Sequence, residues 1–193
     1  MHLGQIRHAQ RNLLDLAIVR DLAASEPVRQ LMTAVLGSGC FAVRGMLFNK
    51  TPASNWKIVW HQDKTIAVKV RKDVADFGPW SMKAGVQHVQ PGASVMAGML
   101  AIRLHLDESN ENNGPLRVIP GSHKAGNLSA EAIDTWRMQP SVVCTVPKGG
   151  AILMRPLLLH ASSSSIAPGT RRVVHFEFAA GELPGGLEWH DRA

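Results

Sequence analysis

The sequence contains no tyrosine, only two cysteines and no long apolar run. Cys40 and Cys144 lie too far apart in the sequence to indicate a zinc site or a disulfide framework. The best candidate for a membrane segment, Val95–Ile102, is much shorter than the roughly 18 residues of a spanning helix, so we interpret it as a buried strand. The N-terminal residues show no signal-peptide core. These absences lead us to expect a protein of the reducing cytoplasm.

Positive charge is in excess, but it is not concentrated anywhere along the chain. The sequence has 21 Lys and Arg against 15 Asp and Glu, a formal net charge of +6. It has no basic run or basic helical stripe, and its aromatic residues do not alternate with basic ones as a base-stacking surface requires. We therefore expect a small-molecule substrate, which the basic balance allows to be anionic, rather than nucleic acid or a membrane. A monomer or a homodimer is expected.

A chain of 193 residues is expected to form one domain. Its N-terminal part has apolar residues at helical spacing, which predicts helices over 12–25 and 26–37. Ser25 is the expected N-cap of the second helix, Pro27 lies near its first turn, and a glycine ends it. We therefore expect residues 1–38 to form a helical layer.

The rest of the chain consists of short segments that are rich in β-branched and apolar residues and separated by Gly, Pro and Asn turns. No helical segments alternate with them, so they predict a closed or sandwiched antiparallel sheet such as a jelly roll, over residues 40–180. Asp73–Gly92 interrupts the series and is expected to be an irregular loop that serves as a lid or binding loop. The expected strands are 41–50, 55–62, 64–72, 99–108, 115–122, 141–149, 151–163 and 171–181.

Two His-x-Asp motifs provide candidate metal ligands, His61-x-Asp63 and His105-x-Asp107. Residues i and i+2 of a strand point to the same face, so each pair could place an imidazole and a carboxylate on one metal. A second histidine from a distant strand would complete the two-His, one-carboxylate triad that leaves positions of an Fe(II) ion open. His160, at the end of the expected strand segment MRPLLLH, suits either pair. Spacing alone does not choose between the two motifs.

Arg171 and Ser162 are candidates for binding an acidic cosubstrate. Arg171 opens the strand that follows His160, after a turn at 167–170, and could pair bidentately with a dicarboxylate that chelates the metal. Ser162 lies two residues beyond His160 and could donate a further hydrogen bond to that carboxylate. Arg172 should then point to the opposite face of the strand.

Several of these stretches together resemble the phytanoyl-CoA dioxygenase family. The resemblance covers residues 41–180 and rests on four motifs in order: MLFNKTP (46–52), WHQD (60–63), HLDESNENNGPLRVIPGSHKAG (105–126), and LLLHASSSS (157–165) followed by RRVVHFEFA (171–179). Members of this family are Fe(II)- and 2-oxoglutarate-dependent oxygenases. The resemblance therefore implies a cupin-like double-stranded β-helix and a requirement for Fe(II), 2-oxoglutarate and O2.

The resemblance also chooses between the two His-x-Asp motifs. It assigns the metal to His61, Asp63 and His160, and the cosubstrate carboxylate to Arg171. The second motif, which begins at His105, is then expected to support the fold or the ligands without contacting the metal.

Further residues are implicated by their positions in the family motifs. Met46 matches a position that contacts 2-oxoglutarate. Arg103 stands where some members carry a tryptophan beside the cosubstrate, which is a departure from the family pattern. Substrate specificity is expected to come from the 73–92 loop, whose candidate lining residues are Trp80, Lys83 and His88.

The activity implied is hydroxylation of an aliphatic C–H bond in a small molecule, with release of succinate and CO2. An aspartate at position 63 favours hydroxylation, because related halogenases lack a carboxylate there. Two alternatives stay open. One is a cupin-like metal-binding or regulatory domain without turnover, and the other is a hydrolase or isomerase that holds a different divalent ion. Arg171 at the cosubstrate position argues against the second.

Overall fold

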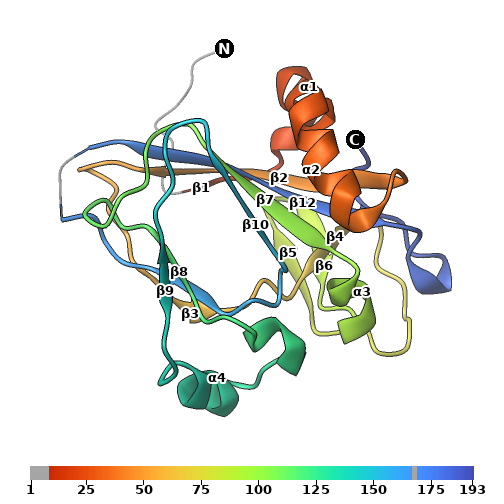
Figure 1. Ribbon diagram of the computed structural model, residues 1–193. Coiled ribbons are helices and arrows are strands. Elements are labelled where there is room, and N and C mark those ends of the chain that lie inside the picture. Colours follow the sequence, from red (N-terminus) through yellow and green to blue (C-terminus); the bar gives the residue numbers. More distant parts are fainter. Residues whose placement is uncertain (1–8, 167–168) are drawn as a thin grey trace.

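The computed structural model describes residues 9–166 and 169–193, and the strands of this part form three antiparallel sheets (Figure 1). Two long strands, β2 (Cys40–Lys50) and β12 (Arg171–Ala180), pair over their full length in the largest sheet. This five-stranded sheet has the order β1-β2-β12-β7-β10. Its other members are β1 (Ala9–Gln10), β7 (Leu100–His105) and β10 (Ala151–Met154).

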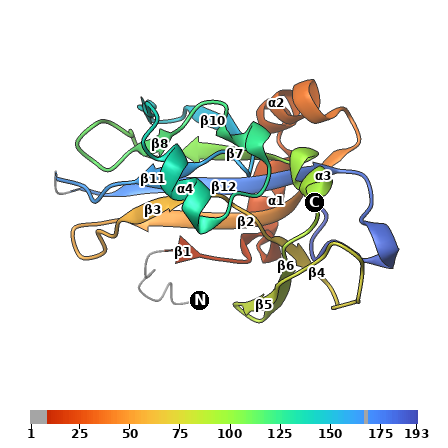
Figure 2. The ribbon, with the colours of Figure 1, turned by 90° about the horizontal axis from the view of Figure 1, so that it is seen from below.

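A four-stranded sheet of order β3-β11-β8-β9 faces the large sheet, as the two views in Figures 1 and 2 show. Its strands are β3 (Ile58–His61), β8 (Leu116–Val118), β9 (Val142–Cys144) and β11 (His160–Ser162). A small third sheet, β4-β6-β5, is formed by β4 (Ile66–Val68), β5 (Trp80–Lys83) and β6 (Val86–Val89). The mainly β, double-stranded β-helix fold predicted from the sequence is confirmed.

The predicted N-terminal helices cover the outer face of the five-stranded sheet (Figure 1). A 3-10 turn η1 (Leu13–Asp15) leads into α1 (Ala17–Ala24) and α2 (Glu26–Leu36). Buried side chains of the helices, such as Met32, pack on buried residues of the sheet, such as Phe176 and Phe178. Burial of side chains of this size contributes about 1.5–3 kcal/mol each relative to exposure. The helical layer is therefore held by its apolar face.

The second helix, α2, has the predicted end residues, but the predicted cap at its start is not formed. Ser25 stands at the N-cap of α2, but its hydroxyl donates back to the carbonyl of Leu22, so it does not cap the helix. Pro27 lies in the first turn, and Gly37 follows the last turn with a positive φ of 85°. Residues 1–8 lie outside the described residues, as do 167–168 of the predicted turn.

The prediction of an irregular loop over Asp73–Gly92 is wrong in its second half. Residues of β5 and β6 form a hairpin there, and β6 also pairs with β4. The hairpin turns at Ala84 and Gly85, which both have positive φ values. A two-residue turn of this kind normally carries Asn-Gly or Asp-Gly, so an alanine at its first position gives no recognisable turn signal.

Other predicted strands are interrupted. The segment Val95–Ile102 begins in a short helix, α3 (Ala93–Ala97), and enters β7 only at Leu100. The segment 151–163 is two strands, β10 and β11, separated by a turn that contains Pro156, a residue with no N–H to donate to a sheet.

The remaining elements are short helices outside the two facing sheets. They are η2 (Ser122–Ala125), α4 (Ala130–Trp136) and η3 (Pro184–Gly186). The α4 helix was not predicted, although the Ser129 hydroxyl caps it by accepting a hydrogen bond from the Ala132 N–H. Among the described residues, no helix is long and apolar enough to cross a bilayer.

Candidate metal centre

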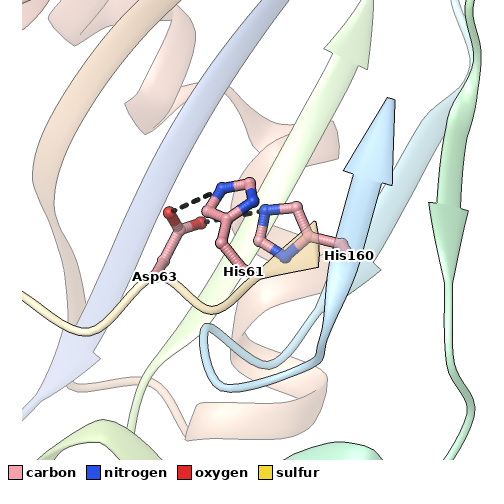
Figure 3. A group of neighbouring side chains, drawn as sticks. All are labelled: His61, Asp63 and His160. Carbon is pink, nitrogen blue, oxygen red and sulfur yellow. Dashed lines mark ion pairs between the residues drawn. The ribbon is translucent and has the colours of Figure 1, made fainter. Parts of the chain in front are cut away.

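Three side chains converge between the two facing sheets (Figure 3). His61 is the last residue of β3 and His160 the first residue of β11, and antiparallel pairing places them directly opposite each other. His160 therefore begins its strand, whereas the sequence predicted that it would end one. Asp63 lies two residues beyond the end of β3, and its backbone N–H donates to the Pro156 carbonyl at 3.0 Å. The turn before β11 thus fixes the third ligand candidate.

Gln62 holds the segment that joins the histidine to the aspartate. Its buried side-chain amide donates to the carbonyls of Gly126 and Leu157 and accepts from the N–H of Leu128. Gln62, the middle residue of the His-Gln-Asp motif, is therefore hydrogen-bonded to two other segments. The direction of the neighbouring Asp63 carboxylate depends on these hydrogen bonds. The sequence alone did not indicate this role.

The donor atoms of the three residues face one another. The Nε2 atom of His160 lies 3.6 Å from Asp63 Oδ2, and the Nε2 atom of His61 lies 3.9 Å from Oδ1. One potential ligand atom from each residue lies within 4.8 Å of the other two. The imidazole centroids of His61 and His160 are 4.2 Å apart. This spacing suits a single metal ion bound by two imidazoles and one carboxylate.

The tautomer of both histidines follows from their backbone contacts. The Nδ1 atom of His61 lies 2.8 Å from the Val59 carbonyl, and that of His160 lies 2.8 Å from the Leu158 carbonyl. A carbonyl can only accept, so each Nδ1 must carry the hydrogen and donate it. Each Nε2 is left with a lone pair directed at Asp63. Orientation of a metal-binding histidine by its other ring nitrogen is the usual arrangement in metalloproteins.

The charge states also match a metal site. Burial lowers the pKa of His160 to about 4, although Asp63 opposes the shift, so the imidazole is neutral at pH 7. Burial alone would raise the pKa of Asp63. The basic side chains around it outweigh that effect and hold the Asp63 pKa far below its usual range; they are His160, His175, His61 and Arg44. A neutral imidazole and an ionised carboxylate are the forms that bind metal.

The triad opens into a cavity of about 420 Å³ between the sheets. Its wall includes every residue that the sequence predicted to bind the metal or the cosubstrate, namely His61, Asp63, His160, Arg171, Ser162, Met46 and Arg103. Arg171 and Arg103 are both buried, and the Nε atom of each has no hydrogen-bond partner within the described chain. Burial lowers the pKa of Arg171 to about 10, with Arg103 adding to the effect, so the guanidinium is still charged at neutral pH. Unsatisfied buried cations of this kind suit an acidic ligand.

Lys50 is a pocket residue that sequence reasoning missed. It ends β2 directly opposite Arg171, and the residue is only 2% exposed. The Nζ atom donates to Ser162 Oγ at 2.8 Å and to the Ser163 carbonyl. The Ser162 hydroxyl in turn donates to the Gly114 carbonyl. Lys50 is the last residue of the MLFNK motif, and its position at the strand end facing Ser162 depends on pairing that local sequence does not reveal.

The Asn-Asn-Gly turn requires a glycine at position 114. Gly114 has a positive φ of 70°, and a Cβ there would lie 2.3 Å from the Ser163 carbonyl oxygen and 2.7 Å from Lys50 Nζ. No side chain fits at that distance. The glycine therefore allows the turn to approach the strand that carries Ser162.

Met46 and Arg103 both line the cavity. The Met46 sulfur accepts from Arg44 Nη2 at 3.3 Å. The Arg103 guanidinium stacks 5.2 Å over the Phe48 ring, and its Nη1 atom is 3.4 Å from His175 Nδ1. Both residues therefore lie beside the triad, but neither provides a donor atom to it.

The second His-x-Asp motif is not brought together by the fold. Asp107 lies beyond the end of β7 and pairs with Arg172, which donates to it from its backbone N–H, Nε and Nη2, each at 2.8 Å. His105 is buried, and both its ring nitrogens lack a hydrogen-bond partner among the described residues. Neither residue lines the cavity. The predicted outward direction of Arg172 agrees with this ion pair, in which its side chain is 47% exposed.

The three lining residues expected from the 73–92 segment are separated by the hairpin. Only Lys83 lines the cavity. Trp80 packs against the hydrophobic cluster under the small sheet, and Arg71 stacks on its ring at 5.4 Å. His88 is buried, and burial, with help from Arg44, lowers its pKa to about 3.

The sequence matches the model of one protein family over most of its length. Residues 4–173 match phytanoyl-CoA dioxygenase (PhyH). Among characterised proteins, the peroxisomal phytanoyl-CoA dioxygenase of Mus musculus is 26% identical over 161 residues, which is 76% of this chain and 41% of that protein. The Bos taurus enzyme is 27% identical over 158 residues, 74% of this chain and 40% of that protein. The chain thus spans about two fifths of the length of these relatives.

Solved structures share the same fold at low sequence identity. SnoK, a non-heme alpha ketoglutarate dependent carbocyclase from nogalamycin biosynthesis, aligns with a TM-score of 0.69 and 13% identity, covering 94% of this chain and 68% of SnoK. EctD from S. alaskensis with 2-oxoglutarate and 5-hydroxyectoine gives a TM-score of 0.67 and 22% identity, covering 90% of this chain and 56% of EctD. At these low sequence identities the structural similarity supports the assignment of the fold alone.

Proposed function

The chain belongs to the phytanoyl-CoA dioxygenase family, and from this premise we propose that it is an Fe(II)- and 2-oxoglutarate-dependent dioxygenase acting on a small molecule. One observation supports this most strongly. The two-His, one-carboxylate cluster and an unpaired buried arginine line the same cavity. A metal-binding domain without an acidic cosubstrate would have no use for Arg171 beside the metal.

His61, Asp63 and His160 would hold the iron through the two Nε2 atoms and the carboxylate. The two histidines are already in the required tautomer, so the residues present fit a divalent metal without rearrangement. Bound there, iron supplies the oxidative chemistry that converts 2-oxoglutarate and O2 to succinate and CO2 and places the second oxygen atom on an aliphatic C–H bond of the substrate.

Arg171 and Lys50 would bind the carboxylate of 2-oxoglutarate that is remote from the metal, and Ser162 would join them by turning its hydroxyl away from the Gly114 carbonyl. Arg171 provides a planar pair of N–H donors, which matches a carboxylate. Ser162 already links the Lys50 ammonium to the strand that begins with the ligand His160, so the two sites are joined by one short strand. Burial of these cations excludes water and strengthens their attraction for the dianion.

The experiment is an anaerobic reconstitution with Fe(II), followed by addition of air-saturated buffer and 2-oxoglutarate. Succinate is then quantified, first without substrate and then with a panel of carboxylic acids, acyl-CoA esters and amino-acid derivatives. We expect slow succinate release alone and faster release with a substrate, both abolished by chelation of the metal. Stoichiometric binding of metal and 2-oxoglutarate without any succinate would instead indicate a cupin-like binding domain.

A further inference from the structure

Basic side chains dominate the wall of the metal cavity. Seven lysines and arginines line it, and Asp63 is the only lining carboxylate in the described chain. Of the seven, Lys50 and Arg171 belong to the part of the cavity proposed above for 2-oxoglutarate, and the charge of Arg103 acts on both of them. Another three, Arg11, Arg44 and Lys83, form a second group, which we call the distal cation cluster.

The two basic groups are separated along one strand, with Lys50 at the end of β2 and Arg44 near its middle. Arg44 and Lys50 are both on β2, six residues apart, which is a separation of about 20 Å between their Cα atoms at the usual rise of a strand. Lys50 contacts Ser162, next to His160 in β11, whereas Arg44 contacts the carbonyl of Thr65, two residues beyond Asp63. The metal ligands therefore lie between the cosubstrate cations and the distal cation cluster.

The distal cation cluster is assembled from three separate segments. Arg11 Nη1 and Arg44 Nη2 both point at the sulfur of Met46, at 3.6 and 3.3 Å. Lys83 Nζ donates to the Thr65 hydroxyl at 2.7 Å, and Arg44 Nη1 donates to the carbonyl of the same residue at 3.2 Å. The three cations thus share two neutral contact residues, and a thioether is only a weak acceptor.

The negative charge near the distal cation cluster is too small to neutralise it. Glu177, buried on β12, pairs with Arg44, with 3.2 Å between Oε1 and Nη1. Within the described chain, neither Arg11 nor Lys83 forms an ion pair with a carboxylate of its own. Burial lowers the pKa of Arg11 and of Lys83, and the nearby Arg44 lowers both further, as expected for like charges held together; Glu177 and Asp63 oppose these shifts only in part.

We propose that Arg11, Arg44 and Lys83 bind the anionic group of the primary substrate, which is therefore an acid carrying a carboxylate or a phosphate. The inference rests on the proposed function, because it takes the metal cavity to be an oxygenase active site. The anion would anchor one end of the substrate at the distal cation cluster, so that the part of the molecule lying over His61 and Asp63 is the part that is oxidised. Excess positive charge between low-dielectric walls would also favour entry of an acid over that of its neutral analogue.

Binding of three matched probes tests this inference. The protein is loaded with Mn(II) and N-oxalylglycine, which occupies the 2-oxoglutarate position without reacting, and is titrated by calorimetry with octanoate, octyl phosphate and the neutral octanamide. We expect the acids to bind at least about tenfold more tightly than the amide, as for a charge placed beside unpaired cations. Whichever acid binds more tightly identifies the anionic group.

Two variants and two controls assign the effect to the distal cation cluster. Arg11→Gln and Lys83→Met should each weaken acid binding about tenfold and leave N-oxalylglycine binding unchanged. Arg44→Met is avoided, because it would leave the buried Glu177 with only His175 beside it. The matched controls Arg137→Gln and Lys69→Met remove exposed cations that do not line the cavity and should change neither affinity.

The inference is overturned if octanamide binds as tightly as the acids, or if Arg11→Gln and Lys83→Met bind the acids like the unaltered protein. Failure of the proposed function would look different. N-oxalylglycine would then fail to bind the Mn(II)-loaded protein, while the acids, titrated without it, would still report whether the distal cation cluster binds anions.

Discussion

His61 and His160 are direct cross-strand partners of β3 and β11, and each donates its Nδ1 hydrogen to the carbonyl two residues before it in the chain. The two imidazoles, which come from two antiparallel strands, are thus oriented by the same kind of backbone hydrogen bond. Their Nε2 atoms meet at Asp63, which comes from the turn after β3. Strand pairing therefore positions two candidate ligands, whereas the third depends on the packing of a loop.

Gln62 is expected to control metal affinity without touching the metal. Gln62→Leu keeps the size of the side chain but leaves the polar groups of Gly126, Leu157 and Leu128 without their partner. Loss of such support typically weakens metal binding by about 10–100-fold. Titration with Mn(II) checks this, and Gln139→Leu, at an exposed position, serves as the control. Unchanged affinity in Gln62→Leu would show that Asp63 is oriented by other contacts.

Arg171 and Arg172 are expected to differ sharply in their effect on 2-oxoglutarate. Arg171→Gln removes a buried guanidinium from the cavity and should weaken binding by about 2–5 kcal/mol. Arg172→Gln breaks only the outward pair with Asp107 and should leave the affinity nearly unchanged. Calorimetric titration of the Mn(II)-loaded variants measures both. A larger effect at Arg172 would mean that the cosubstrate binds on the other face of β12.

Binding of 2-oxoglutarate is expected to weaken as the pH rises through about 8. Burial, with Arg171 and Arg103, lowers the pKa of Lys50 to about 8, so its ammonium is protonated below that value and loses its charge above it. A dianion attracts the protonated form, so binding near pH 8 should take up a proton. Titrations in two buffers of different ionisation enthalpy detect that uptake. Lys50→Met should abolish the uptake; if the uptake persists, it arises from another group.

Gly114→Ala is expected to destabilise the protein and to disturb the cosubstrate end of the cavity. The substitution forces a side chain into a positive-φ position and against the Ser163 carbonyl. Strain of this kind costs about 1–3 kcal/mol. Thermal unfolding measures the loss, and Gly169→Ala, which has open space around it, is the control. Equal unfolding temperatures for the two variants would contradict the proposed need for a glycine.

The parts of the fold that were predictable are those that local pattern determines. The helices over 12–37 show helical periodicity, and the β-rich texture after residue 40 indicated a jelly roll. The hairpin of β5 and β6 was missed, because Ala84 adopts a turn conformation that its residue type does not signal. The division of residues 151–163 into β10 and β11 depends on Pro156 and on which neighbouring strands each part pairs with. Strand pairing cannot be read from the local sequence.

The candidate site was predictable where spacing and motif order specify chemistry. His61, Asp63, His160, Arg171 and Ser162 come from recognisable motifs, and the fold brings all of them to one cavity. The supporting residues were not predicted, because their roles depend on contacts between segments distant in sequence. Lys50, Arg44 and Glu177 are charged residues in strands, which normally indicate an exposed face, and Arg11 lies just beyond β1.

The central claim is that the metal is held by the first His-x-Asp motif and not by the second. The most direct test is the iron content of His61→Leu and His105→Leu after identical anaerobic reconstitution, with His160 intact in both. We expect His61→Leu to lose stoichiometric iron because it removes an Nε2 ligand, and His105→Leu to retain about one iron per chain at the mixed N/O site. Full iron occupancy in His61→Leu together with loss of iron from His105→Leu would contradict the assignment.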